Sequence, residues 1–269
     1  MAKILFWNTN KNEDIDRYLV DLINENESDI VILAEYCNNI DGLCNKLSYY
    51  REFKPFKTMQ DRIVIAASDE YEREVILDTR YYTMCNIEIF TKEFLLVALH
   101  FPSRLHADDE TRSALASKVI NDINNAMKNL CHDNVAIVGD FNSNPFDNSC
   151  INATCFHAVP SKLVANKRTR TVNGQLYNLY YNPMWNMFGD SVLPTGTYYY
   201  SKGGINTYFW NIFDQVILSP DAANAFAGES LKIVTSVNGK SLLNENEIPD
   251  RHNASDHLPI VFELREERL

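Results

Sequence analysis

Eight polar side chains stand where apolar segments of this sequence begin or end: Asn8, Glu35, His100, Asp140, Asn142, Asp214, Asp256 and His257. They comprise four carboxylates, two amides and two histidines, with no lysine or arginine among them. Carboxylate and amide oxygens are ligands for hard divalent cations such as Mg²⁺ or Mn²⁺. Histidines beside carboxylates can transfer protons near neutral pH. The set therefore indicates metal-assisted chemistry of the kind that suits phosphate groups.

The pattern is clearest in the segment 135–145. Residues 135–138 are small or β-branched and apolar, which is typical of a strand buried on both faces, and they lead through Gly139 to Asp140 and Asn142. Such a strand would hold both polar groups on a rigid support at the rim of a sheet. A simple turn is the alternative, because Asp, Asn, Ser and Pro all favour turns and every strand must end beside something polar. The recurrence of the same residue types at other strand ends favours a shared site.

The first 35 residues predict how two of these side chains meet. The apolar runs 4–7 and 30–34 enclose a segment, 15–23, that has the periodicity of an amphipathic helix. A strand, a helix and a second strand in this order predict a parallel crossover, in which both strands end at the same edge of a sheet. We therefore expect Asn8 and Glu35 to be neighbours.

The remaining segments predict a mixed α/β architecture. Residues 85–99 have the pattern of a hairpin that leads to His100, and 115–130 that of a long helix, whereas 148–208 is rich in turn formers and aromatics. Further strands are predicted at 62–67, 74–77, 212–218, 231–234 and 258–264. We find no internal repeat and no linker, so we expect one catalytic domain over residues 1–269, with more than one mixed β-sheet.

Composition narrows the class of protein. The chain has 269 residues and a formal net charge of −11, which argues against binding to nucleic acid through a broad basic face. A local basic patch, or a site whose acids are offset by bound cations, is compatible with this charge. No apolar run reaches the length of a membrane span, and the N-terminus lacks the pattern of a signal peptide. We expect a soluble, cytoplasmic protein with no membrane span.

Six short motifs, in this order, resemble those of the endonuclease/exonuclease/phosphatase superfamily: 6–8 (Phe-Trp-Asn), 33–35 (Leu-Ala-Glu), 98–100 (Ala-Leu-His), 139–142 (Gly-Asp-Phe-Asn), 213–216 (Phe-Asp-Gln-Val) and 255–259 (Ser-Asp-His-Leu-Pro). Each is weak alone, but together they span nearly the whole chain. The resemblance implies a four-layer α/β sandwich, with two packed mixed β-sheets flanked by helices and the site at one end. It also implies a hydrolase that uses Mg²⁺, or Mn²⁺, to cleave phosphate esters.

The resemblance further implies a role for each residue. Glu35 would be the principal metal ligand, helped by Asn8 and Asp256. Asp140 would position or deprotonate the attacking water, and the other predicted catalytic residues would act around it: Asn142 on a phosphate oxygen, His257 on the scissile phosphate, and His100 as a second histidine supported by Asp214. Abasic-site enzymes of the superfamily have tyrosine where His100 would lie, so His100 favours a deoxyribonuclease-like member.

Four further residues are candidates for substrate binding. Arg168 and Arg170 belong to a small basic cluster that either contacts a phosphate backbone or is a solvated loop. Tyr199 lies in an aromatic stretch, 198–200, that either stacks on bases beside the site or belongs to the core. Arg104 lies four residues past His100 and could reach a phosphate.

Three functions remain open from sequence. The first is a divalent-metal-dependent phosphodiesterase, a nuclease acting on DNA by in-line attack of water. The second is a phosphatase or phosphodiesterase acting on a small molecule or a lipid headgroup, which the negative net charge favours. The third is a binding module without catalysis. The sequence does not define endo or exo action, the number of metal ions or the oligomeric state.

Overall fold

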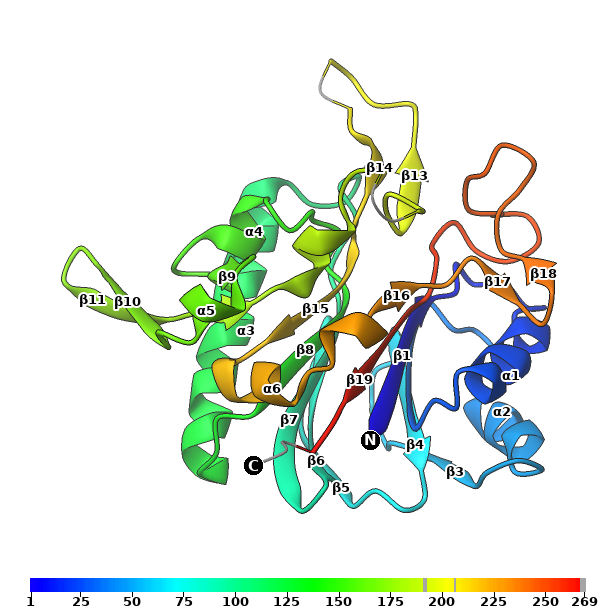
Figure 1. The fold of residues 1–269 in the computed structure, drawn as a ribbon, viewed down its shortest axis with the longest axis horizontal. Helices are drawn as coiled ribbons and strands as arrows, with labels where there is room; N and C mark the ends of the chain where they lie inside the picture. The colour runs from blue at the N-terminus through cyan, green and yellow to red at the C-terminus, as the bar shows by residue number, and fades with distance from the viewer. Residues whose placement is uncertain (191–192, 206, 267–269) are drawn as a thin grey trace.

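Two large β-sheets packed face to face form the centre of the molecule, and helices cover both outer sides (Figure 1). The structure is a computed structural model that describes residues 1–190, 193–205 and 207–266. The predicted fold class, two packed mixed sheets flanked by helices, is confirmed. In the part of the chain that the structure describes, no helix combines the length and the apolar character needed to cross a bilayer.

The first sheet contains both termini of the described chain. Its strands lie in the order β16 (Lys232–Ile233), β19 (Ile260–Leu264), β1 (Ala2–Asn8), β2 (Ile30–Ala34), β4 (Ile63–Ser68) and β3 (Phe53–Pro55). β1 and β2 are parallel, as the crossover predicted, and the other pairs are antiparallel.

The second sheet contains the strand before Asp140. Its strands lie in the order β5 (Arg73–Asp78), β6 (Tyr82–Ile89), β7 (Lys92–His100), β8 (Val135–Asp140), β15 (Asp214–Leu218), β12 (Tyr180–Tyr181) and β9 (Ala158–Val159). β6 and β7 form the predicted hairpin, and β7 runs parallel to β8.

Two-stranded ribbons and helices complete the fold. The ribbons are β10 (Thr169–Val172) with β11 (Gln175–Asn178), β13 (Tyr198–Tyr200) with β14 (Phe209–Asn211), and β17 (Ser236–Val237) with β18 (Lys240–Ser241). The helices are α1 (Asp16–Glu25), α2 (Ile40–Leu47), α3 (Asp109–Leu130), α4 (Asn148–Ile151), α5 (Lys162–Ala165), α6 (Pro220–Ala225) and the 3₁₀ turns η1 (Pro183–Met187) and η2 (Gly228–Ser230). The β13–β14 ribbon stands above the upper end of both sheets in Figure 1, whereas β10–β11 extends to the left, beyond the second sheet.

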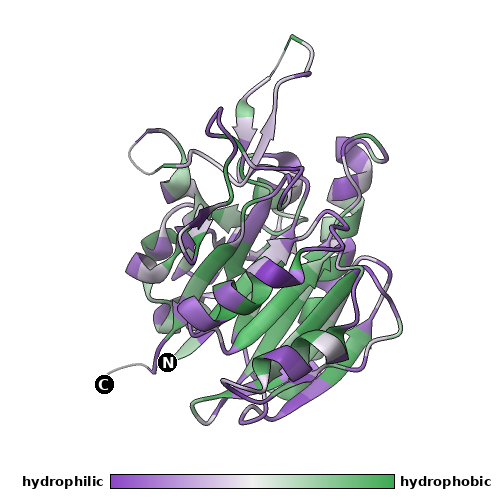
Figure 2. Ribbon diagram, turned by 90° about the vertical axis from the view of Figure 1, so that its right-hand side faces the viewer, coloured by the Kyte–Doolittle hydropathy of each residue, from purple (hydrophilic) through white to green (hydrophobic). Residues whose placement is uncertain are grey.

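Alternation along the strands explains the layers. In β7, Leu95, Val97 and Leu99 pack in one cluster with α3, whereas Leu96 and Ala98 belong to the core between the sheets. The inner strands of the second sheet therefore bury both faces. In Figure 2 the strands at the centre of the molecule are mainly green (hydrophobic), whereas the helices and loops around them carry more purple. Helix α3 begins at Asp109, six residues before the predicted segment, because the side chain of Asp108 caps the N–H of Thr111.

Gly139 allows β7 and β8 to stay paired as far as the last residue of each strand. A Cβ atom at this position would lie 1.9 Å from the carbonyl oxygen of Leu99. Only glycine therefore permits the pairing of His100 with Asp140 one residue later.

Candidate active site

The strand register brings the predicted polar residues to one end of the sandwich. His100, Asp140 and Asp214 are aligned neighbours on β7, β8 and β15. In the other sheet Asn8 pairs with Ala34, so Glu35 follows directly beside it. The predicted convergence of residues from distant parts of the chain is therefore present in the structure.

A cavity of about 860 Å³ opens at this end. Most of the predicted site residues line it: Asn8, Glu35, His100, Asp140, Asn142, Asp256 and His257. Asp214 lies behind His257 and contacts it from the buried side.

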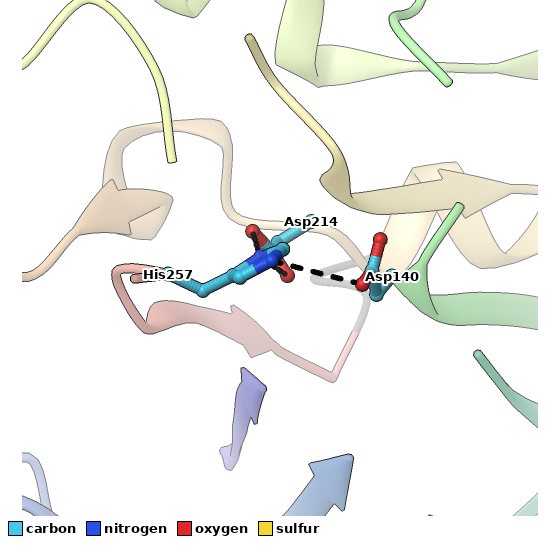
Figure 3. Close-up of side chains that lie close together, drawn as sticks. All are labelled: Asp140, Asp214 and His257. Carbon is cyan, nitrogen blue, oxygen red and sulfur yellow. Dashed lines mark hydrogen bonds and ion pairs between the residues drawn. The ribbon is translucent and has the colours of Figure 1, made fainter. Parts of the chain in front are cut away.

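His257 lies between two buried carboxylates, as Figure 3 shows. Its Nδ1 is 2.8 Å from Asp214 Oδ2, and its Nε2 is 3.9 Å from Asp140 Oδ2. Burial alone would lower the pKa of His257, but the charges of Asp214 and Asp140 outweigh burial and raise it to about 10. The indole N–H of Trp7 donates to the carbonyl of His257 (2.8 Å), and the ring of Tyr198 packs 4.7 Å from the imidazole. His257 is therefore a cation held in a fixed orientation at neutral pH.

Asp140 is the hub of the cavity floor. Its Oδ2 accepts hydrogen bonds from the side-chain amides of Asn8 (3.0 Å) and Asn142 (3.2 Å), and its Oδ1 accepts one from the Asn142 backbone (2.8 Å). Burial raises the pKa of Asp140 to about 7; the charge of His257 opposes this shift and that of Asp214 adds to it. Asn142 holds its position in the left-handed region, at φ +48°, and also donates to the carbonyl of Phe101 (2.9 Å). Asp140 is thus a carboxylate that can exchange a proton near neutral pH.

His100 has different partners from those the resemblance implied. Asp214 bonds to His257, so the expected support of His100 by Asp214 is wrong: β15 lies beyond β8, and its aspartate faces the other histidine. Instead, Nη2 of Arg62 lies 3.4 Å from His100 Nδ1. Burial lowers the pKa of His100 to about 3, helped by the charges of Arg62 and His257.

The tautomer of His100 follows from this contact. A guanidinium can only donate, so Nδ1 must be the acceptor and Nε2 must carry the hydrogen. Nε2 faces Glu35 Oε1 at 3.5 Å and Asp140 Oδ2 at 3.7 Å. His100 is therefore a neutral N–H donor directed into the cavity.

Two groups of side chains could hold a divalent cation. Asp140, Asp214 and His257 offer ligand atoms within 4.8 Å of one another. His257 is a poor ligand, however, because as a cation it has no free ring lone pair and its Nδ1 is bonded to Asp214, and Asp140 already accepts amide hydrogen bonds. We therefore consider the three residues a proton-transfer group.

The predicted ligands Asn8, Glu35 and Asp256 fit a hard cation better. All three offer oxygen, and the carboxylates of Glu35 and Asp256 are 29% and 24% exposed in the cavity. Within the described residues, His100, at 3.5 Å, is the only ion-pair partner of Glu35, and Arg251, at 4.0 Å, is the only one of Asp256. Two carboxylates with free lone pairs in one cavity are a donor set that suits Mg²⁺ or Mn²⁺.

Of the four predicted substrate-binding residues, only Arg104 lines the cavity. Its guanidinium bonds Asp147 at 2.5 Å and lies 5.0 Å from the ring centre of Phe213. Tyr199 points away, because side chains alternate along β13: Tyr198 and Tyr200 line the cavity, whereas Tyr199 packs on Phe209 and Trp210.

Arg168 and Arg170 do not reach the cavity. They lie at the base and in the first strand of the β10–β11 ribbon, on the far flank in Figure 1. Arg168 is exposed and pairs with Asp221 and, at 3.8 Å, with Asp133. Of the two alternatives for this cluster, the structure favours the solvated surface over a place in the cavity, because the β10–β11 ribbon leaves the second sheet before β12 joins it and the cavity lies elsewhere.

Sequence reasoning missed a set of basic residues on the cavity rim: Lys11, Arg62, Arg80 and His106. Arg62 could have been found from the sequence, because it stands immediately before an apolar run, as the predicted site residues also do beside other apolar runs. β4 is antiparallel to β2, so the start of β4 meets the end of β2, and the carbonyl of Arg62 accepts a hydrogen bond from Glu35 N (3.2 Å). Arg80 lies in the turn between β5 and β6, which no motif marks.

Comparisons with known proteins agree with this architecture. No protein-family model and no curated protein matches the sequence. Solved structures do match along nearly their whole length. TDP2 of D. rerio, complexed with a single-strand DNA product, has a TM-score of 0.61 at 14% identity, covering 98% of this chain and 99% of the other. An AP endonuclease from Archaeoglobus fulgidus gives 0.59 at 14% identity, with 98% and 99% covered.

The endonuclease domain of TRAS1, a telomere-specific non-LTR retrotransposon, also matches, with a TM-score of 0.58 at 12% identity over 100% of both chains. The chain therefore shares the two-sheet fold of these solved structures, which is the fold that its motifs implied. The TM-scores show a shared fold, but at such low sequence identity they show nothing more. Function must therefore be argued from the site residues.

Proposed function

We propose that this protein is a divalent-metal-dependent phosphodiesterase, a nuclease that acts on DNA. One observation carries the proposal: a cationic histidine, a buried aspartate with a pKa near neutrality and two uncommitted carboxylates line the same cavity. These are three elements that a metal-assisted hydrolysis of a phosphate ester uses: charge stabilisation, a base and a metal site.

Asn8, Glu35 and Asp256 would hold the cation. A bound Mg²⁺ offsets negative charge on the phosphate oxygens, which favours attack on phosphorus. The exposed carboxylate oxygens of Glu35 and Asp256 give such an ion access to the cavity and leave room for its waters.

Asp140 is the proposed base. Its pKa of about 7 is suited to accept a proton from the attacking water at neutral pH, and the two asparagine amides fix its orientation. The water oxygen forms a bond to phosphorus, and the bond to the leaving oxygen on the opposite side breaks. The leaving oxygen takes a proton from solvent, and Asp140 returns its proton to solvent before the next cycle. His257, held by Asp214, donates to a phosphate oxygen and stabilises its growing charge. His100 would donate its Nε2–H to the same group.

Nucleic acid is the proposed substrate because of the rim. Positive side chains of Lys11, Arg62, Arg80 and Arg104 line the same cavity as the acidic floor, and so do the exposed rings of Tyr200, on β13, and Tyr208, just before β14. Basic groups suit a phosphate backbone and aromatic rings suit unstacked bases. The matching structure of TDP2 with a single-strand DNA product and the matching AP endonuclease support DNA as the substrate class.

A substrate panel with Mg²⁺ or Mn²⁺, with and without chelator, tests the proposal. Plasmid DNA, single-stranded DNA, RNA, a small phosphomonoester and a lipid-headgroup phosphodiester are compared for the wild type and for Asp140→Asn. We expect metal-dependent cleavage of a DNA form that Asp140→Asn loses. Hydrolysis of the small esters alone would replace the nuclease assignment with a small-molecule phosphoesterase, and inactivity on every substrate would contradict catalysis.

A further inference from the structure

Two arginines converge on one tyrosine at the rim of the cavity. The guanidinium carbons of Arg62 and Arg80 lie 5.5 and 5.4 Å from the ring centre of Tyr81. Arg62 comes from the start of β4 in the first sheet, whereas Arg80 and Tyr81 form the turn between β5 and β6 in the second. The three residues, here called the arginine cradle, therefore join the two sheets at the end where the site lies.

Neither guanidinium of the cradle is neutralised within the described residues. Neither takes part in an ion pair, and the Nε of Arg62 is buried without a hydrogen-bond partner. Asp78 lies close by, but its oxygens accept from the backbone of Met59 (2.6 Å) and the hydroxyl of Thr83 (2.6 Å). Two cations gathered on one ring repel each other, and a buried unpaired donor carries a cost, so the arrangement is incomplete without an anion.

The cradle adjoins the proposed reaction centre without being part of it. Arg62 contacts His100 Nδ1 at 3.4 Å, and the carbonyl of Tyr81 accepts from the backbone N–H of His100 at 2.9 Å. Both arginines line the main cavity and also a second, shallower hollow of about 450 Å³. An anion held there would lie on the His100 side of the scissile phosphate, on a ridge that a strand could cross.

We propose that the arginine cradle binds a second phosphate of the substrate, next to the one that is cleaved, so that the enzyme selects nucleic-acid strands over esters with a single phosphate. This inference rests on the proposed function and specifies its substrate class. Arginine suits the task because its planar fork can bind two phosphate oxygens at once, and the ring of Tyr81 keeps both forks in place.

Cleavage of a labelled oligonucleotide tests the cradle. After the cut position is mapped, phosphates on either side of it are replaced one at a time by neutral methylphosphonates. In the wild type we expect one flanking replacement to lower kcat/KM about tenfold, consistent with removal of a charge-assisted hydrogen bond. In Arg80→Gln, which leaves the His100 contact in place, that replacement should have less than a twofold further effect. Arg170→Gln makes the same charge change far from the cavity and should respond like the wild type.

Equilibrium binding gives a test that does not need catalysis. Fluorescence anisotropy in chelator compares the salt dependence of single-strand binding for the wild type, Arg80→Gln and the double variant Arg62→Gln/Arg80→Gln. The slope of log K against log salt should fall by about 0.7 for each phosphate that the variant no longer neutralises. Equal slopes, or an equal methylphosphonate penalty in Arg80→Gln and wild type, would overturn the cradle while leaving the nuclease intact. A wild type that binds with cradle-dependent slopes but cuts nothing would instead contradict only the proposed function.

Discussion

The floor and the rim of the cavity differ in how their side chains are held. Floor residues such as Asp140 and Asp214 stand at the ends of paired strands, are buried, and have fixed partners. Rim residues such as Arg80 and Tyr200 lie in turns or on a ribbon, are exposed, and have few contacts. Floor geometry is therefore set by sheet hydrogen bonding, whereas rim geometry leaves room for a substrate to adjust it.

The two regions also differ in charge, which the net value of −11 conceals. Carboxylates dominate the floor and guanidinium groups dominate the rim. A polyanion meeting this protein would be repelled by most of its surface and attracted at the cavity mouth, since oriented local charge matters more at contact than the total. The floor should therefore control the rate of chemistry, and the rim should control substrate affinity.

Loss of the base should give the largest effect. Asp140→Asn keeps the shape of the side chain but removes its capacity to accept a proton, so kcat should fall by about 10²–10⁴-fold. Steady-state cleavage of DNA at saturating metal measures this. KM should change little, and circular dichroism should report a native fold. Activity within threefold of the wild type would mean that the base lies elsewhere.

Loss of a metal ligand should come next. Glu35→Gln retains one oxygen but loses the charge, so the Mg²⁺ concentration for half-maximal activity should rise by at least about 10–100-fold, the range found even for residues that only support metal ligands. Metal titration of activity gives the number. Glu74→Gln, an exposed glutamate on β5, is the matched control and should titrate like the wild type. An unchanged titration for Glu35→Gln would move the cation to Asp140, Asp214 and His257.

The floor should also give metal-free protein a characteristic pH dependence of stability. The pKa values of Asp140 and His257 are both higher in the folded chain than in the unfolded chain. Between the unfolded and the folded pKa of each group, the folded state therefore binds more protons than the unfolded state. His100, whose pKa is lowered in the folded chain, has the opposite effect below about pH 6.5 and offsets that of Asp140 there. The free energy of unfolding should therefore fall mainly as pH rises from 7 to 9, by roughly 1–3 kcal/mol. Urea denaturation in chelator measures it, and Asp140→Asn should show a flatter profile. Stability that rises with pH in this range would contradict the raised pKa values of Asp140 and His257.

How far the sequence predicts the site depends on the same difference between floor and rim. Asp140, Glu35 and His257 were predictable because each stands beside an apolar run, and strand ends in a sheet meet by geometry. The histidine that Asp214 contacts was not predictable. Both His100 and His257 were expected at the same site, and only the strand order β7, β8, β15 decides which of them Asp214 meets. The aromatic stretch in β13 was correctly placed beside the cavity, but the predicted residue, Tyr199, is one position away from those that line it. The alternation of side chains along the strand decides which tyrosine faces the cavity.

A ring on the rim should affect binding more than chemistry. Tyr200→Ala removes an exposed ring that lines the cavity and should weaken binding by about 1 kcal/mol, roughly fivefold in KM, if a base stacks there. Tyr199→Ala on the same strand is the matched control, because its ring packs on Phe209 and Trp210 away from the cavity. Kinetics on single-stranded DNA should separate the two variants. Equal changes in both would attribute the effect to the ribbon's stability.

The smallest change in activity is expected from substitutions in the basic cluster of Arg168 and Arg170, which does not line the cavity. Arg168→Gln and Arg170→Gln should change KM by less than twofold, since both side chains lie on the far flank from the cavity. Arg168→Gln removes an exposed ion pair with Asp221, which contributes about 0–1 kcal/mol to stability in typical surface pairs. Kinetics with long and short duplexes measure both variants. A KM that rises severalfold only with the long duplex would mean that the nucleic acid continues across the second sheet to the β10–β11 ribbon, and the rim would then extend well beyond the cavity mouth.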